Sequence, residues 1–294
     1  MLELNNLSFR YSAAEQPALS NINLGITTGE CIGLLGANGA GKTTLLSIIS
    51  SLLTPSSGTI EWQEPRSIGL VPQQLAFYSR LSVQENLNLF ADLYQLRGKV
   101  RQQQLESILQ ATDLQPLLKK YAGNLSGGQQ RRLNFAIGVL QPAQLYLLDE
   151  VTVGVDSLNR QRLLTYIQQL RDSGKSIIYT SHYLHETEAI AARIILLDHG
   201  RIQCDIDTRS SLKQEQQLQM RWPEQLPANL ASFCTGLGLH AEYTRSSLFI
   251  AEITEQQFLA LYQFIAASAQ LPCKIDYSQP SLEQFYLKMT GGAL

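Results

Sequence analysis

The eight residues GANGAGKT, at positions 36–43, separate two segments of different periodicity. The residues before them, Cys31–Leu35, form a short apolar run, which predicts a buried strand. The apolar residues after them recur at helical spacing, namely Leu45, Leu46, Ile49, Leu52 and Leu53. The chain is therefore expected to form a strand, a glycine-rich turn and a helix in direct succession.

This loop fits the pattern G-x-x-x-x-G-K-[ST], in which glycines let backbone N–H groups approach a phosphate closely. The helix start adds partial positive charge, Lys42 is placed to reach the β- and γ-phosphates, and Thr43 is placed to ligate Mg²⁺. A merely structural glycine turn is the alternative. The expected nucleotide-binding residues here are Gly36, Asn38, Gly39, Ala40, Gly41, Lys42, Thr43 and Thr44.

Strand and helix patterns alternate along the first two thirds of the chain. Further strands are expected at Leu2–Phe9, Leu19–Leu24, Thr59–Trp62, Ser67–Val71, Leu145–Leu148 and Ser176–Thr180. Helices are expected at Val83–Leu96, Gln102–Ala111, Gln130–Leu140, Leu158–Arg171 and Tyr183–Ala192. This alternation predicts an α/β fold with a mainly parallel sheet covered by helices.

Two adjacent acids, Asp149 and Glu150, end the apolar segment Leu145–Leu148. Carboxylates at the carboxyl edge of a parallel sheet are suited to a phosphate-bound metal. We expect Asp149 to orient Mg²⁺ and Glu150 to polarise the attacking water. Such a pair alone is more often a helix-start charge or a solvated turn, and the upstream phosphate loop favours the functional interpretation.

The segment LSGGQ at positions 125–129 resembles the signature of ATP-binding cassette (ABC) ATPases and precedes the acidic strand, as in that family. Ser126, Gly127 and Gly128 also predict a second helix start with exposed N–H groups. An ordinary serine-capped helix is the alternative. The resemblance implies a P-loop ABC ATPase fold with an antiparallel β subdomain, and a head-to-tail pair in which each signature closes on ATP held by the second ATPase subunit.

Other residues match motifs of that family. Tyr11 resembles the aromatic that stacks on adenine, and Gln73 the Q-loop glutamine that senses Mg²⁺ and water, with Gln74 adjacent as the alternative. Asp156 resembles the D-loop aspartate at the dimer seam, and His182 the switch histidine that contacts the γ-phosphate. The resemblance implies Thr43, Gln73 and Asp149 at the metal, and Glu150, His182 and Gln73 in catalysis. The chain departs from the family at Val151, where proline is common, which leaves the D-loop geometry in question.

The composition of the chain excludes some classes of function. Lys+Arg number 23 against 25 Asp+Glu, so there is no basic excess of the kind that binds nucleic acid. The four cysteines lie far apart, no apolar run approaches bilayer length, and the N-terminus lacks the pattern of a signal peptide. We expect the motor subunit of an ABC transporter, paired with separate transmembrane permease subunits at the cytoplasmic face of the membrane. The alternative is a soluble ABC ATPase acting on nucleic acid or ribosomes.

A glutamine-rich stretch near residue 213 predicts a boundary between an ABC ATPase domain, residues 1–212 with a helical subdomain at about 73–140, and a small α+β domain at residues 213–294. The second unit reads as βαββαβ with a trailing helix, the order of a ferredoxin-like sandwich. The tail at 281–290 resembles the end of ATPases paired with ABC-2-type exporters; the alternative is an amphipathic closing helix.

The segment after Gln73 carries Leu75, Phe77, Tyr78 and Leu81. We expect the helical subdomain, about Gln73 to Tyr121 and including these apolar residues, to receive the membrane partner, and the second unit, from Lys213, to be accessory. Residues this apolar are usually buried, so ordinary core is the alternative.

Overall fold

The computed structural model of the chain describes residues 1–12, 14–63, 67–181, 183–207, 216–268 and 270–278. The chain divides into two compact units, Met1–Ile206 and Asp207–Leu294, and each has its own buried apolar cluster. The boundary at Ile206 precedes the one expected from the sequence at residue 212, and residues 208–215 lie outside the described part.

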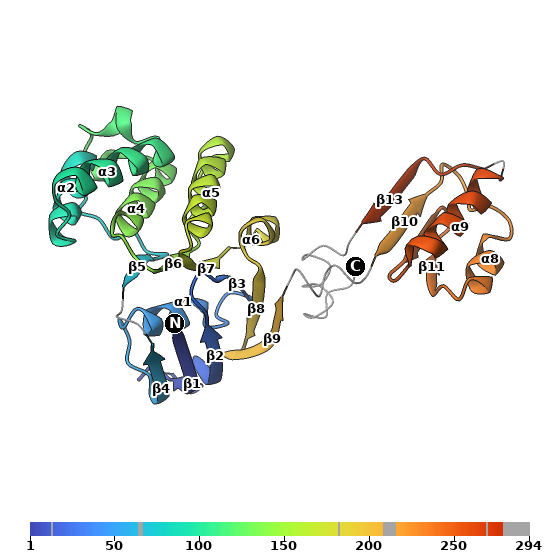
Figure 1. Cartoon of the computed structure of the whole chain (residues 1–294), viewed down its shortest axis with the longest axis horizontal. Coiled ribbons are helices and arrows are strands. Elements are labelled where there is room, and N and C mark those ends of the chain that lie inside the picture. The colour runs from blue at the N-terminus through green and yellow to red at the C-terminus, as the bar shows by residue number, and fades with distance from the viewer. Residues whose placement is uncertain (13, 64–66, 182, 208–215, 269, 279–294) are drawn as a thin grey trace. The chain divides into compact units, whose positions relative to one another are not determined.

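A six-stranded sheet runs through the first unit in the order β5-β6-β7-β3-β8-β9 (Figure 1). Its strands are β3 (Cys31–Leu35), β5 (Ile68–Val71), β6 (Leu145–Asp149), β7 (Ser176–Thr180), β8 (Arg193–Asp198) and β9 (Arg201–Asp207). Neighbouring strands from β5 through β8 are parallel, and β3, β6 and β7 are buried along their whole length. Parallel strands end at one edge, so the segments that follow β5, β6, β7 and β3 begin side by side.

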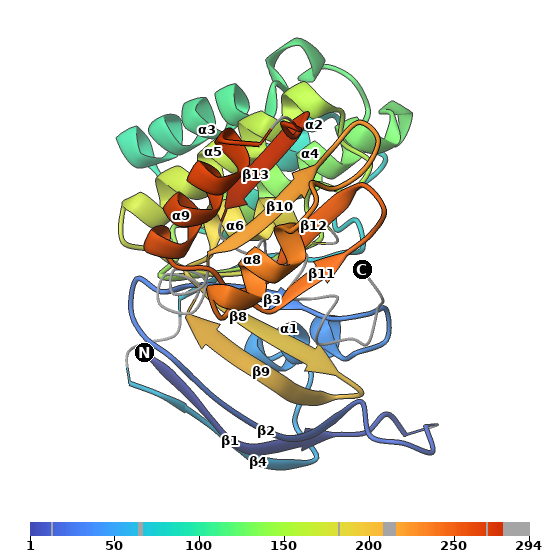
Figure 2. The same cartoon turned by 90° about the vertical axis from the view of Figure 1, so that its right-hand side faces the viewer.

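A second sheet of the first unit is antiparallel, with the order β2-β1-β4. Its strands are β1 (Leu2–Phe9), β2 (Leu19–Ile26) and β4 (Ser57–Trp62). Figures 1 and 2 show helix α1 (Lys42–Ile49) between this sheet and the parallel one. Leu45 and Ile48 of α1 share one buried cluster with Leu4 of β1 and Ile195 of β8. The loop that leads into α1 is therefore anchored by both sheets.

The other helices of the first unit are α2 (Val83–Leu93), α3 (Gly98–Thr112), α4 (Gly127–Leu140), α5 (Ser157–Asp172) and α6 (Leu184–Ile190), with 3-10 turns at Gln115–Leu117 and Ala122–Asn124. The helices α2 to α5 lie together (Figure 1). α4 also packs closely on the edge strand β5, since a Cβ on Gly138 would lie only 2.4 Å from the carbonyl oxygen of Leu70. This contact ties the helical part to the edge of the parallel sheet.

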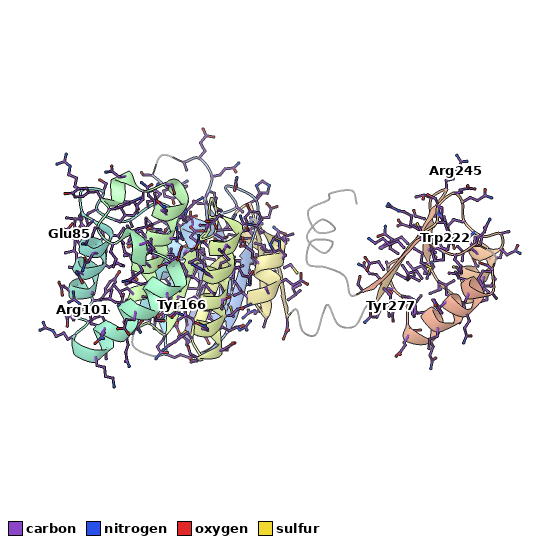
Figure 3. The ribbon with its side chains drawn as sticks, turned by 90° about the horizontal axis from the view of Figure 1, so that it is seen from above. Glu85, Arg101, Tyr166, Trp222, Arg245 and Tyr277 are labelled. Carbon is purple, nitrogen blue, oxygen red and sulfur yellow. The ribbon has the colours of Figure 1, made fainter. Side chains whose placement is uncertain are left out.

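The second unit contains β10 (Gln217–Arg221), α8 (Leu230–Gly236), β11 (Ala241–Tyr243), β12 (Ser247–Ile250), α9 (Glu255–Ala266) and β13 (Lys274–Ser278). Its sheet has the order β11-β12-β10-β13 with antiparallel neighbours, which is a βαββαβ arrangement. Figure 3 labels Trp222, which is buried, and Tyr277, whose ring stacks on Phe258 at 4.1 Å between centroids. The helix expected over 280–289, like the exporter-like tail, lies outside the described residues.

The expected α/β architecture, with a mainly parallel sheet, an antiparallel subdomain and a helical subdomain, is confirmed. Sequence reasoning named no strand over β9. That strand carries charged residues at Arg201, Asp205 and Asp207 and alternates between exposed and half-buried positions, so its apolar signal is weak. No helix in the described part of the chain combines the length and hydropathy needed to cross a bilayer.

Candidate nucleotide-binding and hydrolytic site

The glycine-rich loop leaves β3 and ends at the first turn of α1, as the sequence predicts. Gly36 has φ 152° and Gly41 has φ 106°, which are backbone conformations that favour glycine. A Cβ on Gly36 would lie 2.2 Å from the carbonyl oxygen of Leu197, so no larger residue fits there. Ala37, Asn38 and Gly39 are exposed, and Ala40 is buried. The loop thus presents its backbone to solvent over a rigid base, which suits a phosphate group.

Lys42, the first residue of α1, points back into this loop. Its ammonium donates hydrogen bonds to the carbonyl oxygens of Gly36, at 2.7 Å, and Ala37, at 3.1 Å. The side chain is only 6% exposed, and burial lowers the pKa of Lys42, while the nearby Glu150 and Asp149 carboxylates act in the opposite direction. The loop therefore holds one positive charge with neutral oxygen partners, the kind of charge a phosphate can engage.

Asp149 ends β6 and receives hydrogen bonds from two threonines. The Thr43 hydroxyl of α1 donates to Oδ2 and the Thr180 hydroxyl of β7 donates to Oδ1, both at 2.7 Å. The sequence placed Thr43 and Asp149 at one metal, and the fold brings their oxygens into direct contact. Hydroxyl and carboxylate oxygens are ligands that Mg²⁺ prefers, so this pair fits a nucleotide-bound Mg²⁺.

Glu150 follows directly and is held in the left-handed region, with φ 52°. Its backbone N–H donates to the Thr180 hydroxyl at 3.0 Å and to the Thr180 carbonyl at 3.2 Å. Its carboxylate, in a side chain only 6% exposed, accepts a hydrogen bond from Gln73 Nε2 at 2.8 Å. Gln73 follows β5, next to β6, so the sheet order explains the contact. The geometry favours Gln73 over Gln74.

Tyr11 lies beside the first turn of α1. Its hydroxyl is 3.1 Å from the Thr44 hydroxyl, and its ring packs edge-on against Phe9, with centroids 4.9 Å apart. The tyrosine is 45% exposed, whereas Thr44 is buried. An exposed aromatic face at the rim of the loop is suited to stacking on a nucleobase.

The signature residues form the start of α4. The Ser126 hydroxyl caps the helix by accepting a hydrogen bond from Gln129 N–H, and Ser126 N–H donates one to the Gln129 side-chain oxygen. Within the described residues, Ser126 makes no hydrogen bond to the glycine-rich loop of its own chain. A Cβ on Gly128 would lie 2.8 Å from the carbonyl oxygen of Gly154, whereas one on Gly127 would meet no atom within 4 Å. One face of this helix start is therefore free.

Asp156 caps α5, and its carboxylate accepts hydrogen bonds from both the side chain and the N–H of Asn159, which lower the pKa of Asp156. Its expected place at a dimer seam involves a second chain. His182 lies outside the described residues, although its neighbours Ser181 and Tyr183 are described.

Sequence reasoning missed Thr180, which bonds both acids. The available signal was a hydroxyl residue ending the apolar strand Ser176–Thr180, directly before Ser181. What no pattern showed is that Thr180 is paired with Asp149 in the parallel register of β6 and β7.

The free helix start at the signature, present in addition to a complete phosphate loop, separates this chain from nucleotide-binding proteins with a single phosphate site and places it among the ABC-type ATPases. Similarity to known proteins points the same way. Residues 19–153 match the family described as ABC transporter. The chain is 33% identical to the linearmycin resistance ATP-binding protein LnrL of Bacillus subtilis over 212 residues, which cover 69% of this chain and 68% of LnrL.

Two further relatives carry similar names. The chain is 35% identical to the doxorubicin resistance ATP-binding protein DrrA of Mycobacterium tuberculosis, over 68% of this chain and 63% of DrrA. It is 34% identical to the probable multidrug ABC transporter ATP-binding protein YbhF of Escherichia coli, over 69% of this chain and only 36% of YbhF.

Among solved structures, the dimeric post-hydrolysis state of the ATP-binding cassette MJ0796 with ADP and Pi is similar, with a TM-score of 0.65 and 26% identity. The match covers 71% of this chain and 100% of that one. The chain belongs to the ABC transporter family, and it is an ATP-binding, ATP-hydrolysing subunit of the type found in exporters. The family resemblance drawn from the sequence is confirmed.

Proposed function

We propose that the chain is the ATP-driven motor of an ABC-2-type exporter, working as a head-to-tail pair on separate permease subunits at the cytoplasmic face of the membrane. The observation that carries this proposal is the free helix start at Ser126 and Gly127, in a chain whose phosphate loop is complete without it. The names of LnrL, DrrA and YbhF, as resistance or multidrug ATP-binding proteins, support export.

ATP and Mg²⁺ are the expected cofactors. Lys42 and the N–H groups of the loop would hold the phosphates, Tyr11 would face the base, and Thr43 and Asp149 would hold the metal, with Gln73 beside it. The metal supplies positive charge at the phosphates when bound.

Glu150 is suited to accept the proton of the attacking water as the water oxygen bonds to the γ-phosphorus and the bond from the γ-phosphorus to the β–γ bridging oxygen breaks, with ADP as the leaving group. Gln73 donates to this carboxylate and Thr180 accepts from the Glu150 backbone N–H, which supports a position of Glu150 that is set before substrate arrives. The proposed role of His182 at the γ-phosphate is unchanged from the sequence.

A substitution at Gly127 tests the shared site. Gly127→Asp adds a side chain at a position where an added Cβ would meet no described atom within 4 Å beyond its own helical turn, so it should leave folding and ATP binding intact. In a head-to-tail pair the new charge would face the partner's γ-phosphate, and we expect turnover to fall by about 10-fold or more. ATPase assays and light scattering with ATP, in a Glu150→Gln background for the latter, measure turnover and association.

Gly236→Asp is the matched control, because Gly236, in α8, also has no atom within 4 Å of an added Cβ. This control should hydrolyse ATP normally. If Gly127→Asp retains full turnover and ATP-driven association, the shared-site proposal fails.

The surface proposed for the permease lies just after Gln73. Tyr78 is 56% exposed and Leu75 is 43% exposed, while Phe77 and Leu81 are half-buried, so this segment is not ordinary core. The rings of Tyr78 and Phe90 lie 6.2 Å apart, and Tyr94 continues the row. The buried Asn86 accepts from Tyr78 N–H and donates to the Tyr78 carbonyl, so the backbone is held while the aromatic ring remains available to a partner.

Tyr78→Asp should therefore preserve basal ATPase within about twofold, since it is a surface change away from the phosphate loop. It should weaken co-purification with the proposed permease, when the two are co-expressed, by about 10-fold, because a charge would enter an aromatic contact. Tyr262→Asp, at a tyrosine of the second unit that is also about half exposed, is the control and should co-purify normally. Normal co-purification of Tyr78→Asp together with weakened co-purification of Tyr262→Asp would assign the permease contact to the second unit.

We keep the division into residues 1–212 and an accessory unit at 213–294 as part of this proposal. The two compact units support it.

A further inference from the structure

A buried carboxylate lies outside the residues assigned above. Glu186, on α6, is fully buried, and its Oε2 accepts three hydroxyl hydrogen bonds. The donors and distances are Thr152 at 2.8 Å, Tyr179 at 2.6 Å and Ser181 at 2.9 Å. Burial and the Glu186 carboxylate raise the pKa of Tyr179, so this phenol stays a donor. Burying a carboxylate charge away from water costs free energy, so the presence of Glu186 at this buried position calls for an explanation.

The second carboxylate oxygen faces Arg160 on α5, the helix beside α6 (Figure 1). Arg160 Nε lies 3.6 Å from Glu186 Oε1, and within the described residues neither buried atom has a hydrogen-bond partner. The guanidinium also donates from Nη2 to the Val155 carbonyl at 3.2 Å and covers the Tyr183 ring at 4.5 Å from its centroid. The pair therefore connects two helices through charge rather than through a short hydrogen bond.

These contacts join two segments that flank the hydrolytic site. Thr152 and Val155 belong to the loop between Glu150 and Asp156, and Gly154 of the same loop lies against the signature residue Gly128. Ser181 and Tyr183 follow Thr180, which bonds both acids of the site. The ion pair of the buried Glu186 with the partly exposed Arg160 thus has contacts in the segments that follow Glu150 and Thr180.

We propose that Glu186, acting through Arg160, is a positioning residue for ATP hydrolysis that holds the loop after Glu150 and the segment after Thr180 in one arrangement. The inference rests on the proposed role of Glu150. Within the described residues no hydrogen bond or ion pair joins Glu186 or Arg160 to the phosphate loop, so we expect the pair to affect the catalytic step rather than ATP binding.

Glu186→Gln is the direct test. An amide oxygen still accepts from the three hydroxyls, but the amide N–H₂ faces Arg160 and the negative charge is gone. We expect kcat to fall by about 10- to 100-fold, as for a small displacement of catalytic groups. The KM for ATP and the ATP affinity should stay within about twofold, because the ground-state contacts are unchanged.

Two threonines supply a matched pair of variants. Thr152→Val removes one hydroxyl donor to Glu186 and should lower kcat in the same direction. Thr112→Val removes an equally buried hydroxyl, bonded to the Ile108 carbonyl in α3, and should leave kcat unchanged. A purely structural role of Glu186 would make the two threonine variants alike.

The Arg160→Gln variant completes a double-mutant cycle. If the two charges act as a unit, the kcat of the double variant Glu186→Gln/Arg160→Gln should be no lower than the kcat of the less active of the two single variants. Additive losses, a normal kcat in Glu186→Gln, or equal losses in kcat and ATP affinity would each overturn the inference. The turnover of Glu150→Gln distinguishes a failure of the proposed function from a failure of this inference. Normal turnover of Glu150→Gln would contradict the proposed function. Loss of turnover in Glu150→Gln together with a normal kcat in Glu186→Gln would contradict only this inference.

Discussion

Glu150→Gln should bind ATP as the wild type does and hydrolyse it about 100-fold more slowly or worse, which is the scale of a positioned acid or base. The amide keeps the size of the carboxylate but cannot accept the water proton. The glutamine oxygen can still accept the hydrogen bond from Gln73, which is 2.8 Å long in the wild type, and the backbone N–H still donates to Thr180. The fold of the site should therefore persist. Phosphate release under single-turnover conditions, with nucleotide binding measured separately, gives the two quantities.

Glu188→Gln is the matched control for this variant. Glu188 is an exposed residue of α6, and the same chemical change there should leave turnover unaltered. Equal turnover by wild type and Glu150→Gln would remove Glu150 as the catalytic carboxylate and leave the reaction without a base in the proposed scheme.

Lys42→Ala should weaken ATP binding and abolish turnover. The variant removes the ammonium that now bonds the carbonyls of Gly36 and Ala37, and with it the charge that would meet the β- and γ-phosphates. Losing one charge-assisted hydrogen bond of about 1.5–3 kcal/mol corresponds to about 10- to 100-fold in affinity. Titration with a fluorescent ATP analogue measures this directly.

Lys99→Ala removes an exposed lysine at the start of α3 and should bind ATP normally. The comparison between variants is the sharper criterion. If Lys42→Ala and Glu150→Gln bind ATP equally well, Lys42 does not hold the phosphates in the way proposed.

The sequence by itself determined the features that depend on neighbouring residues. The loop at 36–43 needs only a strand, glycines and a helix start in succession, and the structure has β3 and α1 on either side of it. The helix start at Ser126 depends on a cap three residues from Gln129, which is equally local. Helical and strand periodicity likewise depend on residues within a few turns or pleats, which is why most predicted elements lie where they were expected.

Only the tertiary structure decided which of these local features meet. Thr180 reaches Asp149 because β6 and β7 pair in parallel register, and Gln73 reaches Glu150 because β5 lies next to β6. The Glu186 network joins α5, α6 and two loops, and none of its members is marked by spacing in the chain. Strand order and register arise from packing of the whole sheet, so contacts across it cannot be read from periodicity, which records only one strand or helix at a time.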